Sequence, residues 1–566
     1  MKKRIQALLL ALAMLVSIPA AGCAGKDGAE VSTENSSISE VNSETVVKEN
    51  AMFAANSGEL QVLDDNYRTF YEVFLYSFYD SDGDGIGDIP GLIEKLDYIN
   101  DGDDSTDTDL GMNGIWLMPI MPSTTYHKYD VKDYKDIDPE YGTLEDFKRL
   151  MEECDKRGIH VIIDLVMNHT SSQHPWFLEA RQYLSGLNGA EPSEEECPYY
   201  GYYNFIQEQT NSSYCQLGDT GWYYEAPFWG EMPDLNLKNP AVQTEFEEIV
   251  DFWLDLGVDG FRLDAAKEFY SGAAESNVEV LTWFNDMVKA KKEDAYIVAE
   301  VWTDLATYAQ YYASGIDSCF DFEFADKDGT IANVAKGLSG ASVYGSKQEE
   351  LQSTIGAYNE NYIDAPFYTN HDMGRSAGYY SGEDSEAQTK IAGAMNLMMS
   401  GSAFVYYGEE LGMKGAGKDE NKRAPMQWSS DANAGGMCKG PSDMDAITMK
   451  FGSLEEQEED DASVYNYYKQ AVRLRNMYPA IARGTVAFEE ELSDDALCVV
   501  TKTYGEETIG LFFNISAEEK TVDISSYSIG DGGELTIGGM LLTGENAVTL
   551  EGETLTLPAY SVVLLK

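Results

Sequence analysis

Short apolar runs recur along this chain and alternate with longer segments of helical periodicity. The runs are rich in Val, Ile, Phe and Tyr and end at turn residues, which is typical of buried parallel strands. Segments between them place apolar residues three and four positions apart, as at 143–158 and 241–257, which predicts amphipathic helices. The eight apolar runs lie at 70–78, 114–120, 160–167, 258–265, 295–302, 319–324, 365–372 and 402–410.

Eight strands that alternate with helices predict an α/β fold, a (β/α)8 TIM barrel, here over residues 61–480. The interval between the third and fourth runs is too long for one connection. Its excess, about 172–240, is dense in Tyr, Gly, Trp and Pro, so we expect an inserted domain after strand 3 that protrudes from the catalytic face. Short alternating segments with Gly turns follow, and they predict a C-terminal all-β sandwich domain over 481–566.

The N-terminal segment has the pattern of an export signal rather than of a folded domain. Residues 1–22 combine a basic start with an apolar stretch, and small residues precede Cys23. This arrangement resembles the lipobox of bacterial lipoproteins, in which the Cys is lipidated; a plain secretory signal is the alternative. Residues 23–60 lack sustained periodicity, which predicts a flexible tether. We therefore expect an extracellular protein that is lipid-anchored to the cell membrane, or secreted.

The net charge limits the classes of partner that the protein can bind, and the cysteine spacing limits the kinds of site that it can form. The chain has 39 basic and 98 acidic residues, a formal net charge of −59, which argues against nucleic acid and anionic membrane surfaces as partners. A neutral, polyhydroxylated substrate is compatible with that charge, as is a purely solubilising role. We expect a monomer. The cysteines beyond Cys23 are too scattered for a zinc site; a Cys197–Cys215 disulfide and free thiols are the alternatives.

Three acidic residues follow apolar runs at places where a core would reject a charge. They are Asp264, Glu300 and Asp372, after the fourth, fifth and seventh runs. Because the carboxyl ends of barrel strands meet at one mouth, where such enzymes carry out their chemistry, we expect the three to converge. Arg262 stands two residues before Asp264 and so shares its strand face. The sequence therefore predicts an active site built on carboxylates.

Six ordered motifs give the chain a family resemblance. "DLVMNH" (164–169), "GFRLD" (260–264), "EVW" (300–302) and "TNHD" (369–372) resemble the four main motifs of the alpha-amylase family, glycoside hydrolase family 13. "GIWLMPI" and "GSAFVYYGEE" resemble its two accessory motifs, at the second and eighth strands. The resemblance covers about residues 65–566. It implies a barrel, an insertion after strand three and a C-terminal β-sandwich, as the periodicity also predicts.

The resemblance also implies a role for each motif residue in a retaining cleavage of α-glucosidic bonds. Asp264 matches the nucleophile, Glu300 the acid/base, and Asp372 the third acid, which favours the distorted sugar ring. A retaining reaction needs the first two carboxyl groups about 5 to 5.5 Å apart. We expect Arg262 to keep the nucleophile ionised, Asp164 to orient Arg262, and crowding in the cleft to raise the pKa of Glu300. The expected sugar-binding residues are Tyr129, His127, His169, Arg262, Lys267 and His371.

The segment "DSDGDGIGD" (80–88) predicts a Ca²⁺ site. Its evenly spaced aspartates would repel one another without a cation, and hard oxygen ligands suit Ca²⁺; a bare acidic turn is the alternative. The resemblance adds a backbone carbonyl, so the expected ligands are Asp80, Asp82, Asp84, Ile86 and Asp88. It also indicates Asn168 as a ligand of a possible second metal ion. Glu268 stands where many relatives have a His that helps form that second site.

Two further motifs bear on specificity. "MPDLN" (232–236) resembles the intermediary group between oligo-1,6-glucosidases and neopullulanases, and "RAPMQW" (423–428) is similar to the same neighbourhood. Exo-acting oligo-1,6-glucosidases commonly carry an acid three residues before the stacking Tyr, but Tyr126 occupies that position here, in the "YH" pattern of endo-acting amylases.

We therefore expect an alpha-amylase that cleaves internal α-1,4 bonds of starch and maltodextrins. Its expected partners are this α-glucan substrate and, only through the N-terminal lipid anchor, the membrane. One alternative is an oligosaccharide-directed α-glucosidase, neopullulanase or cyclomaltodextrinase-like enzyme with α-1,6 or transglycosylating activity. Another is a non-catalytic starch-binding lipoprotein. The three intact acids argue against a pure binding protein, which needs neither a nucleophile nor an acid.

Overall fold

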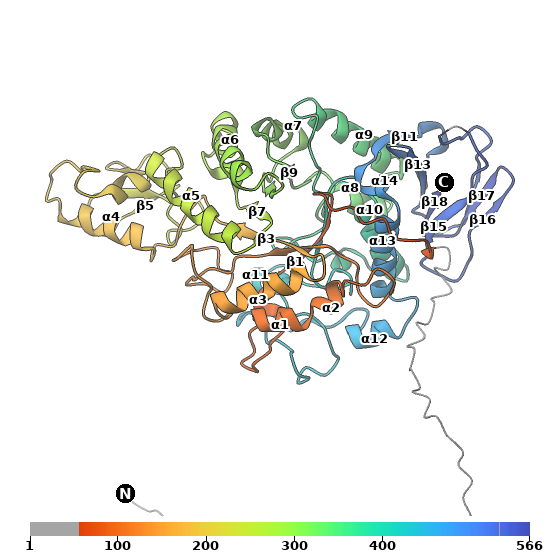
Figure 1. Cartoon of the computed structure of the whole chain (residues 1–566), viewed down its shortest axis with the longest axis horizontal. Coiled ribbons are helices and arrows are strands. Elements are labelled where there is room, and N and C mark those ends of the chain that lie inside the picture. The colour runs from red at the N-terminus through yellow and green to blue at the C-terminus, as the bar shows by residue number, and fades with distance from the viewer. Residues whose placement is uncertain (1–55, 531) are drawn as a thin grey trace, which may run out of the picture. The chain divides into compact units, whose positions relative to one another are not determined.

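The computed structural model describes residues 56–530 and 532–566 (Figure 1). The expected signal segment, Cys23 and most of the tether lie outside these residues, so the lipid anchor and the extracellular location stay predictions. Among the described helices, none combines the length and apolar character needed to cross a membrane.

A parallel sheet forms the centre of the molecule. Its strand order is β10 (Ala403–Tyr406), β1 (Thr69–Val73), β2 (Gly114–Leu117), β3 (His160–Leu165), β7 (Gly260–Leu263), β8 (Tyr296–Ala299) and β9 (Ser318–Cys319). The sheet closes through residues 365–367, because Ala365 pairs in parallel with Phe320 and Phe367 pairs with Phe404. The predicted TIM barrel is therefore confirmed, with each of the eight apolar runs at a strand position.

The barrel interior is filled by aromatic side chains. Phe70 stacks on Tyr296 with ring centroids 5.3 Å apart and on Phe404 at 4.8 Å, and Trp116 and Phe320 belong to the same buried cluster. Aromatic contacts of this kind stabilise a core beyond the area they bury. The strands are therefore rigid supports for side chains at their carboxyl ends.

The predicted amphipathic segments form helices with clear start signals. Thr143 and Asp146 form a capping box at the start of α3 (Leu144–Asp155), and Asn239 caps α5 (Pro240–Asp255), whose first residue is Pro. The other helices of the barrel region are α1 (Ile89–Glu94), α2 (Leu96–Ile99), α6 (Ala274–Lys291), α7 (Leu305–Tyr308), α8 (Thr330–Ala335), α9 (Ser342–Gly356), α10 (Ser385–Leu397), α11 (Asp419–Lys422), α12 (Leu454–Glu458), α13 (Val464–Met477) and α14 (Pro479–Arg483).

The segment between β3 and α5 forms an insertion with its own small sheet. It contains α4 (Pro175–Gly186) and the antiparallel strands β4 (Phe205–Ile206), β6 (Tyr223–Glu225) and β5 (Tyr214–Gln216). The Cys197–Cys215 disulfide is wrong, since both thiols are free. Cys197 is buried at the start of a 3-10 turn that packs on α4, whereas Cys215 lies in β5, beside Gly230.

Two antiparallel sheets form the C-terminal part of the chain. The larger has the order β11 (Thr485–Phe488), β12 (Leu497–Tyr504), β13 (Glu507–Asn514), β18 (Ser561–Leu565) and β15 (Ile537–Leu541). The smaller has the order β14 (Lys520–Asp523), β17 (Thr554–Leu557) and β16 (Thr549–Glu551). The predicted all-β character of this part is confirmed.

Candidate active site

The three predicted acids meet at the carboxyl-terminal mouth of the barrel. Asp264 follows β7 directly, Glu300 follows β8, and Asp372 follows the closing segment 365–367. All three line one cavity of about 550 Å³. The chain turns sharply after Asp264, since Ala265 has a φ of 47°, and this turn lets the Ala265 amide donate to Glu300 Oε2 at 3.0 Å.

Arg262 joins the nucleophile candidate to the acid candidate. Its guanidinium is buried, with Nη1 2.7 Å from Asp264 Oδ1 and Nη2 3.0 Å from Glu300 Oε2. Nη1 also lies 3.0 Å from Asp164 Oδ1, so Asp164 fixes the orientation of the arginine. Because one planar group holds both carboxylates, Asp264 and Glu300 lie side by side, as the separation of about 5 Å in a retaining pair requires.

Burial and charge give Glu300 the protonation of a general acid. Burial raises the pKa of its carboxyl, and the nearby carboxylates of Asp264 and Asp372 raise the pKa further, against the opposing effect of Arg262. A glutamic acid with a raised pKa keeps its proton closer to neutral pH than a free one does. Glu300 can therefore donate a proton where an ordinary Glu would have lost it.

His371 and Asp372 form an ion pair supported by the first barrel strand. Burial alone would lower the pKa of His371, but Asp372, 3.2 Å from Nε2, and Glu72, 2.6 Å from Nδ1, raise it to about 9. Burial alone would raise the pKa of Asp372, yet His371 and Arg423 bring it below its usual range. Asp372 is therefore a fixed carboxylate, a suitable acceptor for sugar hydroxyls.

The predicted sugar-binding residues divide into two groups. His127, Tyr129, His169 and Lys267 line the cavity, as do the three acids. Arg262 and His371 are fully buried behind the cavity wall, and the two ring nitrogens of His371 are engaged by Glu72 and by Tyr129 and Asp372. The structure thus places these two residues as supports of the acids rather than on the sugar-contacting surface.

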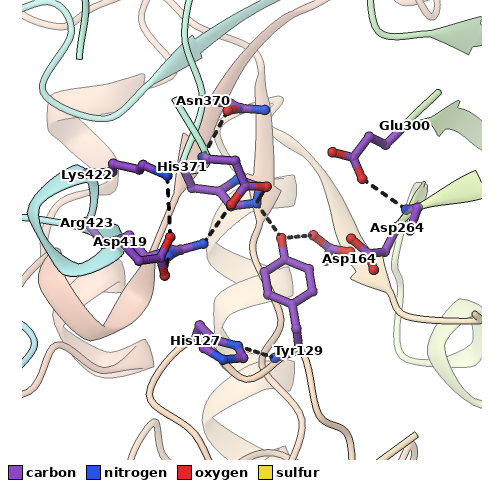
Figure 2. Close-up of polar contacts among 12 residues, drawn as sticks. His127, Tyr129, Asp164, Asp264, Glu300, Asn370, His371, Asp419, Lys422 and Arg423 are labelled. Carbon is purple, nitrogen blue, oxygen red and sulfur yellow. Dashed lines mark hydrogen bonds and ion pairs between the residues drawn. The ribbon is translucent and has the colours of Figure 1, made fainter. Parts of the chain in front are cut away.

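Tyr129 connects several of these groups (Figure 2). Its hydroxyl lies 2.9 Å from Asp164 Oδ2 and 2.8 Å from His371 Nε2. His127 Nδ1 accepts the Tyr129 amide at 3.1 Å, and burial and the charge of Arg423 lower the pKa of His127 to about 4. The imidazole of His127 is therefore neutral and can exchange hydrogen bonds with sugar hydroxyls.

The sequence analysis missed several residues of the site. Glu72, which is buried and bonds to His371 behind the cavity wall, is an acid inside an apolar run, and that break in the apolar pattern is its signal. Trp302 is 44% exposed and stacks on Phe322 with ring centroids 5.1 Å apart, and Phe228 is 50% exposed. Exposed aromatic faces at a cleft suit sugar rings. The cavity wall also contains residues outside the predicted set, namely Phe228, Met232, Ala265, Glu268, Trp302, Asp419 and Arg423.

The aspartate loop converges only in part. Carboxylate oxygens of Asp80, Asp82 and Asp88 lie within 4.8 Å of one another, the spacing of ligands around one ion. Asp84 is outside this group, because its carboxylate accepts the Ile86 amide at 2.7 Å and its carbonyl accepts Lys439 Nζ at 2.7 Å. Three convergent carboxylates fit Ca²⁺ chemistry.

The residue predicted for a second metal ion has a different environment. Asn168 is buried; its Nδ2 donates to Asp234 Oδ1 at 3.0 Å and its carbonyl accepts the Leu235 amide at 2.8 Å. These bonds tie the insertion to the end of β3. Within residues 56–530 and 532–566, the aspartate loop is the single group of three or more clustered His, Cys, Asp or Glu side chains, and the second ion at Asn168 stays a prediction.

Comparisons of sequence agree with this geometry. The family model for the alpha amylase catalytic domain matches residues 72–484. Alpha-amylase 3 of Dictyoglomus thermophilum is 38% identical over 468 residues, covering 80% of this chain and 88% of that protein. Oligo-1,6-glucosidase of Parageobacillus thermoglucosidasius is 30% identical over 540 residues, covering 80% of this chain and 90% of that protein.

Comparisons of structure give the same result. Eubacterium rectale Amy13B is 50% identical and superposes with a TM-score of 0.87, covering 92% of this chain and 99% of that one. An alpha-amylase from H. orenii is 36% identical with a TM-score of 0.77, covering 88% and 99%. With its acids grouped at the barrel mouth and its catalytic domain matched almost throughout, this chain is an enzyme of the alpha-amylase family, glycoside hydrolase family 13.

Proposed function

We propose that this enzyme is an alpha-amylase that hydrolyses internal α-1,4-glucosidic bonds of starch and maltodextrins with retention of configuration. The observation that carries the proposal is the shared contact of Asp264 and Glu300 with one buried guanidinium, Arg262. It supports a nucleophile and an acid held side by side, the arrangement that retention needs.

The reaction then takes two displacements. Asp264 attacks the anomeric carbon while Glu300 gives its proton to the leaving oxygen, and a covalent glycosyl-enzyme forms. Glu300, now a carboxylate, takes a proton from water, whose oxygen attacks the same carbon and releases Asp264. Asp372 holds hydroxyls of the sugar through both steps, and the ring of Tyr129 offers a face for that sugar.

A second candidate function is cleavage of short oligosaccharides, including α-1,6 bonds or glucosyl transfer. The motif "MPDLN" favours it, and so does the 30% identity to a protein named oligo-1,6-glucosidase. The exposed aromatic residues Phe228 and Trp302 at the cavity favour cleavage of a polymer instead, because they extend the surface on which a glucan chain could lie.

Product analysis separates the two candidates. We expect soluble starch to be shortened at random, so that iodine staining falls much faster than reducing ends accumulate. We expect little attack on isomaltose, pullulan or a cyclodextrin under the same conditions. Heat-inactivated enzyme serves as the control. Faster cleavage of isomaltose or cyclodextrin than of starch would contradict the proposal.

We also propose that Asp80, Asp82 and Asp88 bind a structural Ca²⁺. Asp88 accepts the Gly91 amide at 2.6 Å and so caps α1, which would couple the ion to the fold. If Ca²⁺ is present at about 100 times its Kd, removing it with EGTA should lower Tm by about 2 to 3 °C. Asp82→Asn should lower Tm in Ca²⁺ and abolish the EGTA effect.

Asp84→Asn is the matched control for this prediction. It removes a carboxylate from the same loop but from outside the convergent group, so the EGTA effect should persist. An unchanged Tm of the wild-type chain in EGTA and in added Ca²⁺, followed by calorimetry, would leave the loop a bare acidic turn.

A further inference from the structure

A second cavity lies at the end of the barrel opposite to the three catalytic acids. Its wall includes Tyr67, shortly before β1, Asp364, directly before the closing segment 365–367, and Gly401, shortly before β10. These residues precede strands, whereas the catalytic acids follow them, and the two cavities share no wall residue. The volume of about 450 Å³ lies within the range of roughly 300 to 1,000 Å³ that is typical of small-molecule sites.

Three parts of the chain hold this second cavity together. Gln352 of α9 binds Val486 of β11 twice, with Nε2 3.2 Å from the carbonyl and Oε1 2.8 Å from the amide. The helix and the strand pack against each other (Figure 1). Arg483, at the end of α14, binds both carboxylate oxygens of Asp65 at 2.8 and 2.6 Å. A wall fixed in this way is preformed, which lowers the entropic cost of binding a ligand.

Two buried acceptor groups belong to the wall of the second cavity. Asp364 is 4% exposed and Gln348 is 3% exposed. Within the part of the chain that the structure describes, Asp364 Oδ1 and Gln348 Oε1 have no hydrogen-bond partner. Buried acceptors in folded proteins are nearly always paired, because an unpaired one has lost its hydration without replacement. A ligand that donates hydrogen bonds would supply the missing partners.

The charges around the second cavity favour a neutral ligand. Burial and the neighbouring Asp321 raise the pKa of Asp364 well above its usual range, so its carboxyl is uncharged. Arg475 binds the Gly401 carbonyl and stays positive at neutral pH, since burial lowers its pKa only to about 9. A cation is therefore disfavoured. The exposed carboxylate of Glu360 in the wall and the net charge of −59 disfavour an anion.

Two tyrosine rings add aromatic surface to the same wall. Tyr67 and Tyr362 are half-buried and line the cavity. Tyr362 is supported by the ring of Tyr312, with centroids 5.8 Å apart, and the Arg483 guanidinium lies 5.4 Å from the Tyr67 ring centroid. Aromatic rings suit the apolar faces of sugars, and sugar hydroxyls are donors for unpaired oxygens. Walls of this kind therefore match a neutral, polyhydroxylated ligand.

We propose that this cavity is a second carbohydrate site, which binds a glucosyl unit of a glucan at the end of the barrel away from the catalytic acids. Tyr67 and Tyr362 provide the ring surface, and Gln348 and Asp364 accept hydrogen bonds from the sugar. The inference goes beyond the proposed hydrolysis and does not depend on it, because binding at this cavity needs no cleavage.

The test counts bound sugars by titration calorimetry in a chain that does not hydrolyse them. In Glu300→Gln we expect two maltotetraose molecules per chain, one in each cavity. With Tyr362→Ala added, the Kd of one binding event should rise about tenfold or more, because an aromatic face is lost. Tyr358→Ala is the matched control, since Tyr358 is 47% exposed and lies near the end of α9 but outside the cavity wall. It should leave both events unchanged.

Gln348→Met tests the hydrogen-bonding wall without disturbing the fold. Met has a similar length but no polar oxygen, and an unpaired buried acceptor can be replaced by an apolar group at little cost in stability. We expect an unchanged Tm, whereas the Kd of the second event should rise about three- to tenfold, the effect of one neutral hydrogen bond. This variant decides the matter even if Tyr362→Ala does not fold.

A parallel titration with cellotetraose distinguishes the linkage of the glucan. An event that is weakened by Tyr362→Ala and Gln348→Met supports the proposal with either sugar, and the sugar that binds more tightly identifies the linkage. If neither variant weakens any binding event, whatever the total number of bound sugars, the proposal is overturned and the cavity holds water only. Starch hydrolysis by the wild-type chain reports separately on the proposed function.

Discussion

Replacing Asp264 with Asn should reduce starch hydrolysis by about 10⁴-fold or more, the scale seen when a catalytic nucleophile is removed. The amide has nearly the same shape but cannot form the glycosyl-enzyme. Arg262 keeps Asp164 and Glu300 as partners, so the fold of the site should persist. Initial rates on starch and the Tm of the variant measure the two effects separately. Asp286→Asn, on the exposed face of α6, is the matched control and should retain wild-type activity.

The stereochemistry of a rescue product identifies the nucleophile directly. With Asp264→Gly, α-glucosyl fluoride and azide, we expect a β-glucosyl azide, because azide attacks from the face that the carboxylate has left. This is a single displacement with inversion. An α-configured azide, or starch hydrolysis within tenfold of the wild-type rate in Asp264→Asn, would assign the nucleophile to another residue.

The barrel could be predicted from sequence because buried parallel strands are continuous apolar runs, and eight such runs are separated by helical segments. The strand bounds within the sixth and seventh runs are harder to predict, since β9 has two residues and the closing segment pairs only through isolated bridges. Asp321, inside the sixth run, is buried, and its Oδ1 accepts the Tyr308 hydroxyl at 2.8 Å. Hydrophobic pattern alone does not show where so short a strand ends.

Residues close to a motif in sequence were predictable, and residues brought in by folding were not. Arg262 precedes Asp264 on one strand, so its place followed from periodicity. Glu72 is 299 positions from its partner His371, and Asp419 is 293 positions from Tyr126. Only the closed barrel places these partners together, because β1 lies beside β10 and α11 follows β10.

Spacing also could not show which polar side chains converge. The aspartates at 80–88 are evenly spaced, yet Asp84 bonds to its own loop and receives Lys439 from a distant segment. The spacing of Cys197 and Cys215 likewise does not show whether the two side chains meet, since both thiols lie on different elements of the insertion and remain free. Side-chain direction is a property of the folded loop, and sequence intervals alone do not fix it.

Replacing Glu300 with Gln should lower starch hydrolysis by about 10²- to 10⁴-fold, the contribution of a general acid. The loss on α-glucosyl fluoride should be much smaller in the first displacement, since fluoride leaves without a proton. With Glu300→Ala and azide, the product should be an α-glucosyl azide, because azide attacks the glycosyl-enzyme after one inversion by Asp264. This product is the opposite of that expected for Asp264→Gly, so the two rescues assign the two roles independently.

The pH profile gives a second, independent measure of the same group. Glu300 must be protonated to act as the acid, so kcat/KM on maltodextrin should fall as pH rises through the Glu300 pKa. Burial and the neighbouring Asp264 raise that pKa, which moves the fall to higher pH than for an ordinary Glu. Gln cannot titrate, so Glu300→Gln should lose this alkaline limb in its residual activity. A limb that persists at the same pH would belong to another group, such as His371 with a pKa of about 9, and Glu300 would not be the acid.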